Sequence, residues 1–161
     1  MKIGIIVYSQ TGHTLEVAEK LKQRLIGEGH SVDLEQVTVV GGRTPQMKEF
    51  ELETLPEAGL YDAIVFGSAV EAFSLSPVLS RYLNQIDSLQ GKQVACLVTQ
   101  QFPFPWMGGN RAIRQMKKIC QSKGASIRTT GVVNWVKSRR EKTMIAAVDH
   151  LSKGIGSDLH F

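Results

Sequence analysis

The residues of this chain whose types and spacing could do chemistry form one short run, Ser9-Gln10-Thr11-Gly12-His13-Thr14. The run follows an apolar stretch and leads directly into a helical pattern. At such a junction the free backbone N–H groups and the positive end of the helix dipole meet at one point, which suits a phosphate. The run contains no Lys or Arg, so the anion would be held by amides and by the hydroxyl groups of Ser9, Thr11 and Thr14. The alternative is an ordinary turn with a helix cap.

The run fits neither of two familiar nucleotide-binding patterns. The nucleoside triphosphate loop ends in Gly-Lys followed by Ser or Thr, and the dinucleotide fingerprint needs three spaced glycines. This run has a single glycine, Gly12, and no lysine. The other histidines are scattered along the chain, so we expect no metal site and no Ser-His-Asp arrangement of catalytic residues.

Five strand-like apolar runs alternate with helical patterns along the chain. The runs cover residues 3–8, 31–37, 62–68, 93–99 and 127–134. The first, third and fourth are almost continuously apolar, which is typical of strands covered on both faces. This alternation predicts one domain over residues 1–161, an α/β fold of three layers in which helices cover both faces of a five-stranded parallel sheet. Residues 38–61 are the exception, because they lack a complete helical pattern.

The loops beyond the carboxyl ends of the strands form the predicted site, because ligands of open parallel sheets bind there. The first loop is Ser9–Thr14. The second contributes Ala69, Val70, Glu71, Ala72 and Phe73, and the third contributes Thr99, Gln100, Gln101, Phe102, Trp106, Gly108 and Gly109. Aromatic residues in loops rich in Pro and Gly suit walls around a flat aromatic ligand. The alternative is that they only pin two long loops to the core.

Charge is distributed unevenly along the chain. Residues 1–110 carry a net charge of −4 and residues 111–161 a net charge of +8, which gives +4 overall. The predicted helix after Gly109 carries five basic residues, namely Arg111, Arg114, Lys117, Lys118 and Lys123. This basic C-terminal third is either a docking face for an acidic partner or anionic substrate, or an ordinary solvated face. Because no nucleic-acid module accompanies the charge, we expect no nucleic-acid partner.

The sequence carries no membrane or export pattern. No apolar run approaches the roughly 18 residues of a membrane span, so we expect none. The chain begins directly with a strand pattern and has no targeting sequence, which predicts a cytoplasmic protein. Cys96 and Cys120 lie inside apolar patterns without metal-ligand spacing, and we expect both to be buried, reduced thiols.

In the three loops and the strands that lead to them, the chain resembles the flavodoxin family. The resemblance covers nearly the whole chain and rests on residues 9–14, 61–68, 76–83, 91–94 and 108–110. It implies FMN as the cofactor, a flavodoxin-like sheet order of 2-1-3-4-5 and the phosphate in the first loop. It also implies that the isoalloxazine ring lies between the second and third loops, with Phe73 and either Phe102 or Trp106 stacking on it.

Two departures from the family pattern bear on function. Many members place a Trp near the position of Glu71, and some place there a Gly whose peptide flips toward the flavin, whereas this chain has Val70-Glu71-Ala72. A carboxylate at Glu71 would oppose the anionic reduced flavin through charge repulsion. The chain is also basic overall, whereas electron carriers of the family are typically acidic around the flavin.

The resemblance implies a protein that transfers electrons through its flavin and exchanges them with a redox partner protein. The alternative is an NAD(P)H-dependent quinone reductase that uses FMN, in which the apolar loop from Phe102 to Trp106 would hold a small aromatic or quinone acceptor. A third alternative is a non-redox scaffold that binds an acidic partner through the basic C-terminal third.

Overall fold

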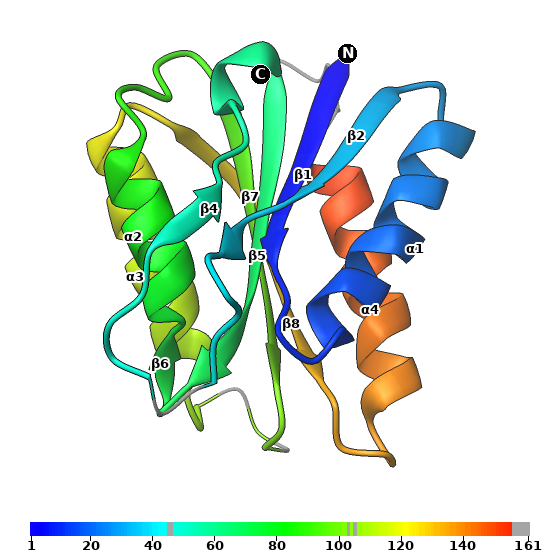
Figure 1. The fold of residues 1–161 in the computed structure, drawn as a ribbon. Helices are drawn as coiled ribbons and strands as arrows, with labels where there is room; N and C mark the ends of the chain where they lie inside the picture. Colours follow the sequence, from blue (N-terminus) through cyan, green and yellow to red (C-terminus); the bar gives the residue numbers. More distant parts are fainter. Residues whose placement is uncertain (45–46, 103, 105, 156–161) are drawn as a thin grey trace.

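The centre of the protein is a parallel sheet whose strands come from distant parts of the chain (Figure 1). In spatial order its strands are β2 (Ser31–Gln36), β1 (Lys2–Tyr8), β5 (Ala63–Glu71), β7 (Gln93–Gln100) and β8 (Ser126–Asn134). Counted as the five predicted strands, this order is 2-1-3-4-5, so the predicted sheet is confirmed. The computed structural model describes residues 1–44, 47–102, 104 and 106–155.

Helices cover both faces of this sheet, which confirms the three-layer α/β fold. Helices α1 (His13–Gly27) and α4 (Arg140–Gly154) lie on one face, and α2 (Pro77–Gln85) and α3 (Gly109–Ser122) lie on the other (Figure 1). Neighbouring side chains of β5 point to opposite faces. Val65 therefore lies in the core under α1 and α4, whereas Phe66 lies in the core under α2 and α3.

The two cysteines lie in the core, whereas one large apolar side chain of α4 faces solvent. Cys96 and Cys120 are free and buried, as predicted, and burial raises the pKa of the Cys120 thiol to about 12. On α4, Ile145 is 63% exposed and lies outside the apolar stripe of this helix. The stripe of α4 is instead completed by Ala147, which follows Met144 at helical spacing and is buried.

The segment without a helical pattern, residues 38–61, forms no α-helix among its described residues. It contains a two-stranded antiparallel sheet of β3 (Thr38–Val39) and β4 (Leu52–Thr54), followed by a 3-10 turn η1 (Ala58–Leu60). Tyr61 then packs against β1, because a Cβ on Gly4 would lie only 2.4 Å from its ring. In its described residues, the crossover between β2 and β5 therefore consists of short strands, turns and irregular chain.

The second loop begins later than the sequence predicts. β5 continues to Glu71 and turns into a short antiparallel strand β6 (Ser74–Leu75), so Ala69, Val70 and Glu71 are strand residues. The turn consists of Ala72 and Phe73, whose φ angles are 49° and 61°. Such turns usually carry Gly or Asn, because other residues pay a steric cost in the left-handed region. The sequence lacks that signature, so the hairpin was not predicted.

None of the helices in the described part of the chain has the length and apolar character that a bilayer crossing requires.

Candidate functional site

The first loop presents a row of free backbone donors at the start of α1. Gly12, with φ of 90°, turns the chain from β1 into the helix, and its carbonyl accepts the first helical hydrogen bond from Glu16 at 3.0 Å. The Ser9 hydroxyl accepts a hydrogen bond from the Leu15 N–H at 3.1 Å. Among the described residues, the N–H groups from Gln10 to Thr14 have no protein acceptor. These five amides are available to an anion.

The two threonines of this loop are not equivalent. Thr14 is 1% exposed, and its hydroxyl lies 2.8 Å from the hydroxyl of Thr99 on β7. Thr11 is exposed and lines the same cavity as Thr14. The sequence predicted that both hydroxyls bind the anion. In this structure the Thr14 hydroxyl joins the loop to the sheet, whereas the Thr11 side chain makes no hydrogen bond within the described part of the chain.

His13 does not add positive charge to the loop. Its ring stacks on Trp135 with 4.2 Å between the ring centroids and 14° between the planes. Burial, followed by the charge of Arg140, lowers the pKa of His13 below its ordinary value of 6.5. Its Nδ1 lies 3.3 Å from Nε2 of Gln101, which brings the third loop onto the first. At neutral pH the imidazole is therefore uncharged and serves as a packing surface.

A cavity of about 210 Å³ joins the three predicted loops at the carboxyl ends of β1, β5 and β7. Eleven predicted site residues line it: Ser9, Gln10, Thr11, His13, Thr14, Ala69, Val70, Glu71, Thr99, Gln100 and Gln101. Tyr8, which was not predicted, completes the lining. Gly12 belongs to the same loop, whereas Ala72, Phe73, Phe102, Trp106, Gly108 and Gly109 lie beyond the lining, on the hairpin and on the third loop.

The aromatic residues of the second and third loops contact each other. Phe73 and Phe102 are stacked with centroids 5.1 Å apart and planes at 16°. Trp106, which is 71% exposed, stacks on Phe104 instead. The backbone of the two loops is also in close contact, since a Cβ on Gly108 would lie 2.9 Å from the Cα of Phe73. Phe73 and Phe102, which were predicted to stack on a flat ring between the loops, therefore contact each other directly, and Trp106 lies outside this contact.

Gln100 organises the third loop from beneath. Its side chain is almost fully buried, and its amide nitrogen lies 2.7 Å from the Phe102 carbonyl, 2.6 Å from the Phe104 carbonyl and 2.8 Å from Oδ1 of Asn134. Its amide oxygen is buried without a partner among the described residues. A Cβ on Gly109 would lie 2.3 Å from that oxygen and 2.9 Å from Cγ1 of Val132, so a larger residue requires these side chains to shift. The sequence placed Gln100 in the site but gave no indication of this role.

Glu71 does not stand beside the cavity as an isolated charge. Both of its carboxylate oxygens face Nη1 of Arg43, at 2.9 and 3.1 Å. The side chains of Arg43 and Glu71 are 2% and 14% exposed. The sequence predicted an uncompensated carboxylate here and did not identify Arg43. Arg43 lies in the segment that shows no helical or strand pattern, so nothing in the local sequence indicated its partner.

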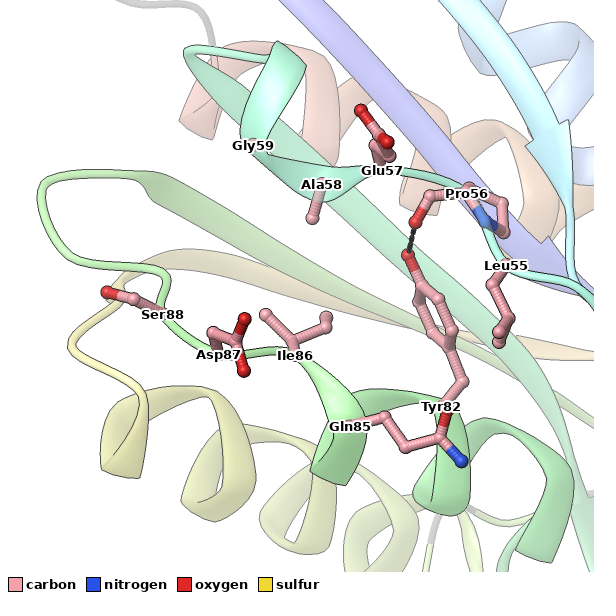
Figure 2. A pocket seen from close by; sticks show the side chains of 10 residues that line it. All are labelled: Leu55, Pro56, Glu57, Ala58, Gly59, Tyr82, Gln85, Ile86, Asp87 and Ser88. Atoms are coloured by element: carbon pink, nitrogen blue, oxygen red, sulfur yellow. Dashed lines mark hydrogen bonds between the residues drawn. The ribbon is translucent and has the colours of Figure 1, made fainter.

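A second groove, of about 390 Å³, lies at the other end of the sheet (Figure 2). It is bounded by the turn η1 and by the end of α2. Tyr82 spans the groove, and its hydroxyl donates a hydrogen bond to the carbonyl of Pro56, while burial raises the pKa of Tyr82. None of the predicted site residues lines it, and it shares no residue with the cavity at the first loop.

Comparisons with known proteins agree with this architecture. A family model described as a flavodoxin domain matches residues 4–134. The flavodoxin of Streptococcus pneumonia TIGR4 superposes with a TM-score of 0.72 at 16% identity, over 99% of this chain and 100% of that one. Oxidised Flavodoxin 2 from Bacillus cereus gives a TM-score of 0.70 at 19% identity, over 96% and 97%.

A flavoprotein from Lactobacillus acidophilus NCFM, solved in complex with FMN, gives a TM-score of 0.61 at 19% identity, over 81% of this chain and 92% of that one. At such identities the similarity shows a shared fold. No curated protein sequence matches this chain at a significant level. The family match spans most of the chain and supports FMN as the cofactor. The chain belongs to the flavodoxin family.

Proposed function

We propose that this protein binds FMN in the cavity at the first loop and transfers electrons through the flavin to a redox partner protein. The observation that carries the proposal is the row of free amides from Gln10 to Thr14, which opens onto a cavity shared with the ends of β5 and β7. A phosphate satisfies these donors and sits at the positive end of the α1 dipole.

The chemistry of the donors fits a phosphate that carries a flat, apolar group. The loop supplies amides and the Thr11 hydroxyl but no cation, and His13 is neutral at neutral pH. Binding therefore depends on directed hydrogen bonds to a charged group, which are stronger than bonds between neutral groups. Such a site favours a monophosphate ester over a nucleoside triphosphate, whose binding loop carries a lysine and a hydroxyl group for Mg²⁺.

The ring of the flavin requires the two aromatic loops to move apart. Phe73 and Phe102 are in direct contact at 5.1 Å, so a third ring enters between them only if the loops separate. The cavity of about 210 Å³ is also smaller than the ~300–1,000 Å³ of typical ligand pockets. The bound cofactor supplies the redox chemistry, while Phe73, Phe102 and the loop amides bind and orient it.

One observation favours a quinone reductase as the second candidate function. Phe104 and Trp106 form an exposed stacked pair with centroids 5.9 Å apart, and the guanidinium of Arg139 lies 5.3 Å from the Phe104 ring. Such a platform suits a flat acceptor, and a nearby cation suits the phosphates of NAD(P)H. The basic face of α3, where Arg111, Arg114 and Lys118 are exposed, supports an acidic partner protein instead.

The colour and redox behaviour of the purified protein test these functions together. The carrier requires a yellow protein with one flavin per chain that NAD(P)H alone does not reduce. Rapid bleaching by NAD(P)H would favour the reductase. A colourless protein that takes up no added FMN would contradict both redox functions and favour the scaffold.

A further inference from the structure

We infer that Arg43 is a positioning residue of the flavin site, which holds the β5–β6 hairpin in place and cancels the charge of Glu71 next to the cofactor. The inference rests on the proposed function, because it concerns FMN. It adds a residue from outside the three loops, and it reverses the expectation that Glu71 acts on the flavin as a free negative charge.

The ion pair of Arg43 and Glu71 is largely buried, and its carboxylate accepts hydrogen bonds from two side chains. The Glu71 carboxylate lies 2.9 and 3.1 Å from Nη1 of Arg43, and the Ser76 hydroxyl, which is itself buried, donates to the same carboxylate. Only 2% of the Arg43 side chain is exposed. Removing one partner of such an ion pair strongly destabilises the folded protein, because the other charge is left buried without compensation.

Arg43 also ties the crossover segment to the first loop. The side-chain amide of Gln10 donates to the carbonyl of Arg43, and Nε of Arg43 donates to the Met47 carbonyl at 3.2 Å. The guanidinium lies 5.1 Å from the centre of the Phe50 ring. Its side chain connects the crossover with the hairpin, while its backbone carbonyl, which Arg43→Gln keeps, contacts the first loop. A surface cation with a chance partner would not make this set of contacts.

The turn of the β5–β6 hairpin has a strained backbone, so contacts that hold the adjacent strand end in place stabilise it. Ala72 and Phe73 both have positive φ angles, which cost free energy in residues other than glycine. Glu71 is the residue directly before this turn and pairs with Ser74 across it. By fixing Glu71, Arg43 fixes the strand end from which Phe73 projects toward Phe102. Arg43 thus supports the hairpin at Glu71, while Gln115 of α3 supports it at β6 by accepting hydrogen bonds from the Ser74 hydroxyl and the Leu75 N–H.

The same pair sets the charge that the flavin experiences. Glu71 lines the cavity of the first loop, so a free carboxylate there would oppose the added negative charge of the reduced flavin. With Arg43 in place, the pair is neutral as a whole. Removing Arg43 exposes the flavin to the carboxylate, whereas removing Glu71 leaves an uncompensated cation. The two single changes should therefore shift the ratio of the dissociation constants of reduced and oxidised FMN in opposite directions.

Four variants test the inference: Arg43→Gln, Glu71→Gln, the double variant, and Arg81→Gln as the matched control. Arg81 also packs on Phe50, with its guanidinium 3.9 Å from the ring centre, but it makes no ion pair with Glu71. The readouts are the denaturant midpoint of the FMN-free protein and the ratio of the dissociation constants of reduced and oxidised FMN, obtained from redox titration of the loaded protein.

We expect Arg43→Gln to raise the ratio of reduced to oxidised dissociation constants about five- to tenfold. A tenfold change corresponds to a potential lower by about 30 mV for two electrons. Glu71→Gln should lower the ratio, the double variant should lie near the wild type, and Arg81→Gln should stay within about twofold. In the FMN-free protein, either single change should lower the midpoint, and the double variant should lower it by less than the sum.

The inference is overturned if Arg43→Gln and Arg81→Gln shift the ratio equally, or if the stability effects of Arg43→Gln and Glu71→Gln simply add. A wild-type protein that binds no FMN contradicts the proposed function and the redox half of the inference. In that case, non-additive stability effects still support the positioning half, so the two failures are distinguishable.

Discussion

The different surroundings of the two threonines in the first loop lead to a prediction that separates binding from stability. Thr11 is exposed at the cavity, whereas Thr14 is buried and hydrogen-bonded to Thr99. We expect Thr11→Ala to weaken FMN binding with little change in stability. We expect Thr14→Val, which keeps the shape of the side chain, to lower stability with little change in FMN binding.

The sizes of the two effects follow from what each hydroxyl contacts. A hydrogen bond to a charged group contributes about 1.5–3 kcal/mol, so Thr11→Ala should weaken FMN binding roughly 10- to 150-fold. Thr14→Val leaves the Thr99 hydroxyl buried without a partner, which costs about 1–3 kcal/mol. For a domain of this size the loss corresponds to a melting temperature lower by roughly 2–12 °C.

The assay combines fluorescence titration of the FMN-free protein with its thermal unfolding. Riboflavin, which lacks the phosphate, is the matched ligand control, because Thr11→Ala should leave its affinity unchanged. The double variant Thr14→Val, Thr99→Val should recover part of the lost stability, since two apolar groups replace both partners. The reasoning is refuted if Thr14→Val costs FMN affinity as much as Thr11→Ala does, or if Thr11→Ala weakens both ligands equally.

Three further predictions follow from the hairpin, the histidine and the basic helix. Ala72→Gly should raise the melting temperature by about 1–4 °C, because it relieves a positive φ angle. Ala69→Gly in the preceding strand should lower the melting temperature. Equal losses in the two variants would contradict backbone strain at Ala72. Because folding lowers the pKa of His13, the unfolded chain binds more protons than the folded protein as the pH falls below 6.5, so stability should decrease there. The urea midpoint of His13→Gln should lose this pH dependence. An identical pH profile in the variant would exclude His13 as its source. Reversing Arg111 and Arg114 to Glu should slow reduction by an acidic donor at low salt and not at high salt in stopped-flow traces, whereas unchanged rates at low ionic strength would identify this face as solvated only.

Features that depend on neighbouring residues could be predicted from the sequence. The loop from Ser9 to Thr14 is recognisable because a buried strand, small polar residues and a helical stripe follow one another directly. The sheet order came with the resemblance, and the alternation of apolar runs indicated the layers. The meeting of the second and third loops at one edge of the sheet was predicted, but the direct contact of Phe73 with Phe102 was not, because the prediction placed a flavin ring between them.

Features that depend on distant contacts could not be predicted. The turn at Ala72 and Phe73 lacks the Gly or Asn that normally indicates a hairpin, and pairing between β5 and β6 overrides the local preference. Arg43 is 28 residues from Glu71, in a segment with no periodic pattern. The partner of a buried charge is set by tertiary packing, so the pairing of Glu71 with Arg43 became visible only in the structure.

The central claim is that the uncharged first loop holds FMN by its phosphate. The most direct measurement is a comparison of FMN and riboflavin binding to the FMN-free wild-type protein by flavin fluorescence. The account predicts one FMN per chain and an affinity for FMN at least about a hundredfold higher than for riboflavin, because several hydrogen bonds to a charged group are lost with the phosphate. Equal affinity for the two flavins, or binding of neither, would contradict it.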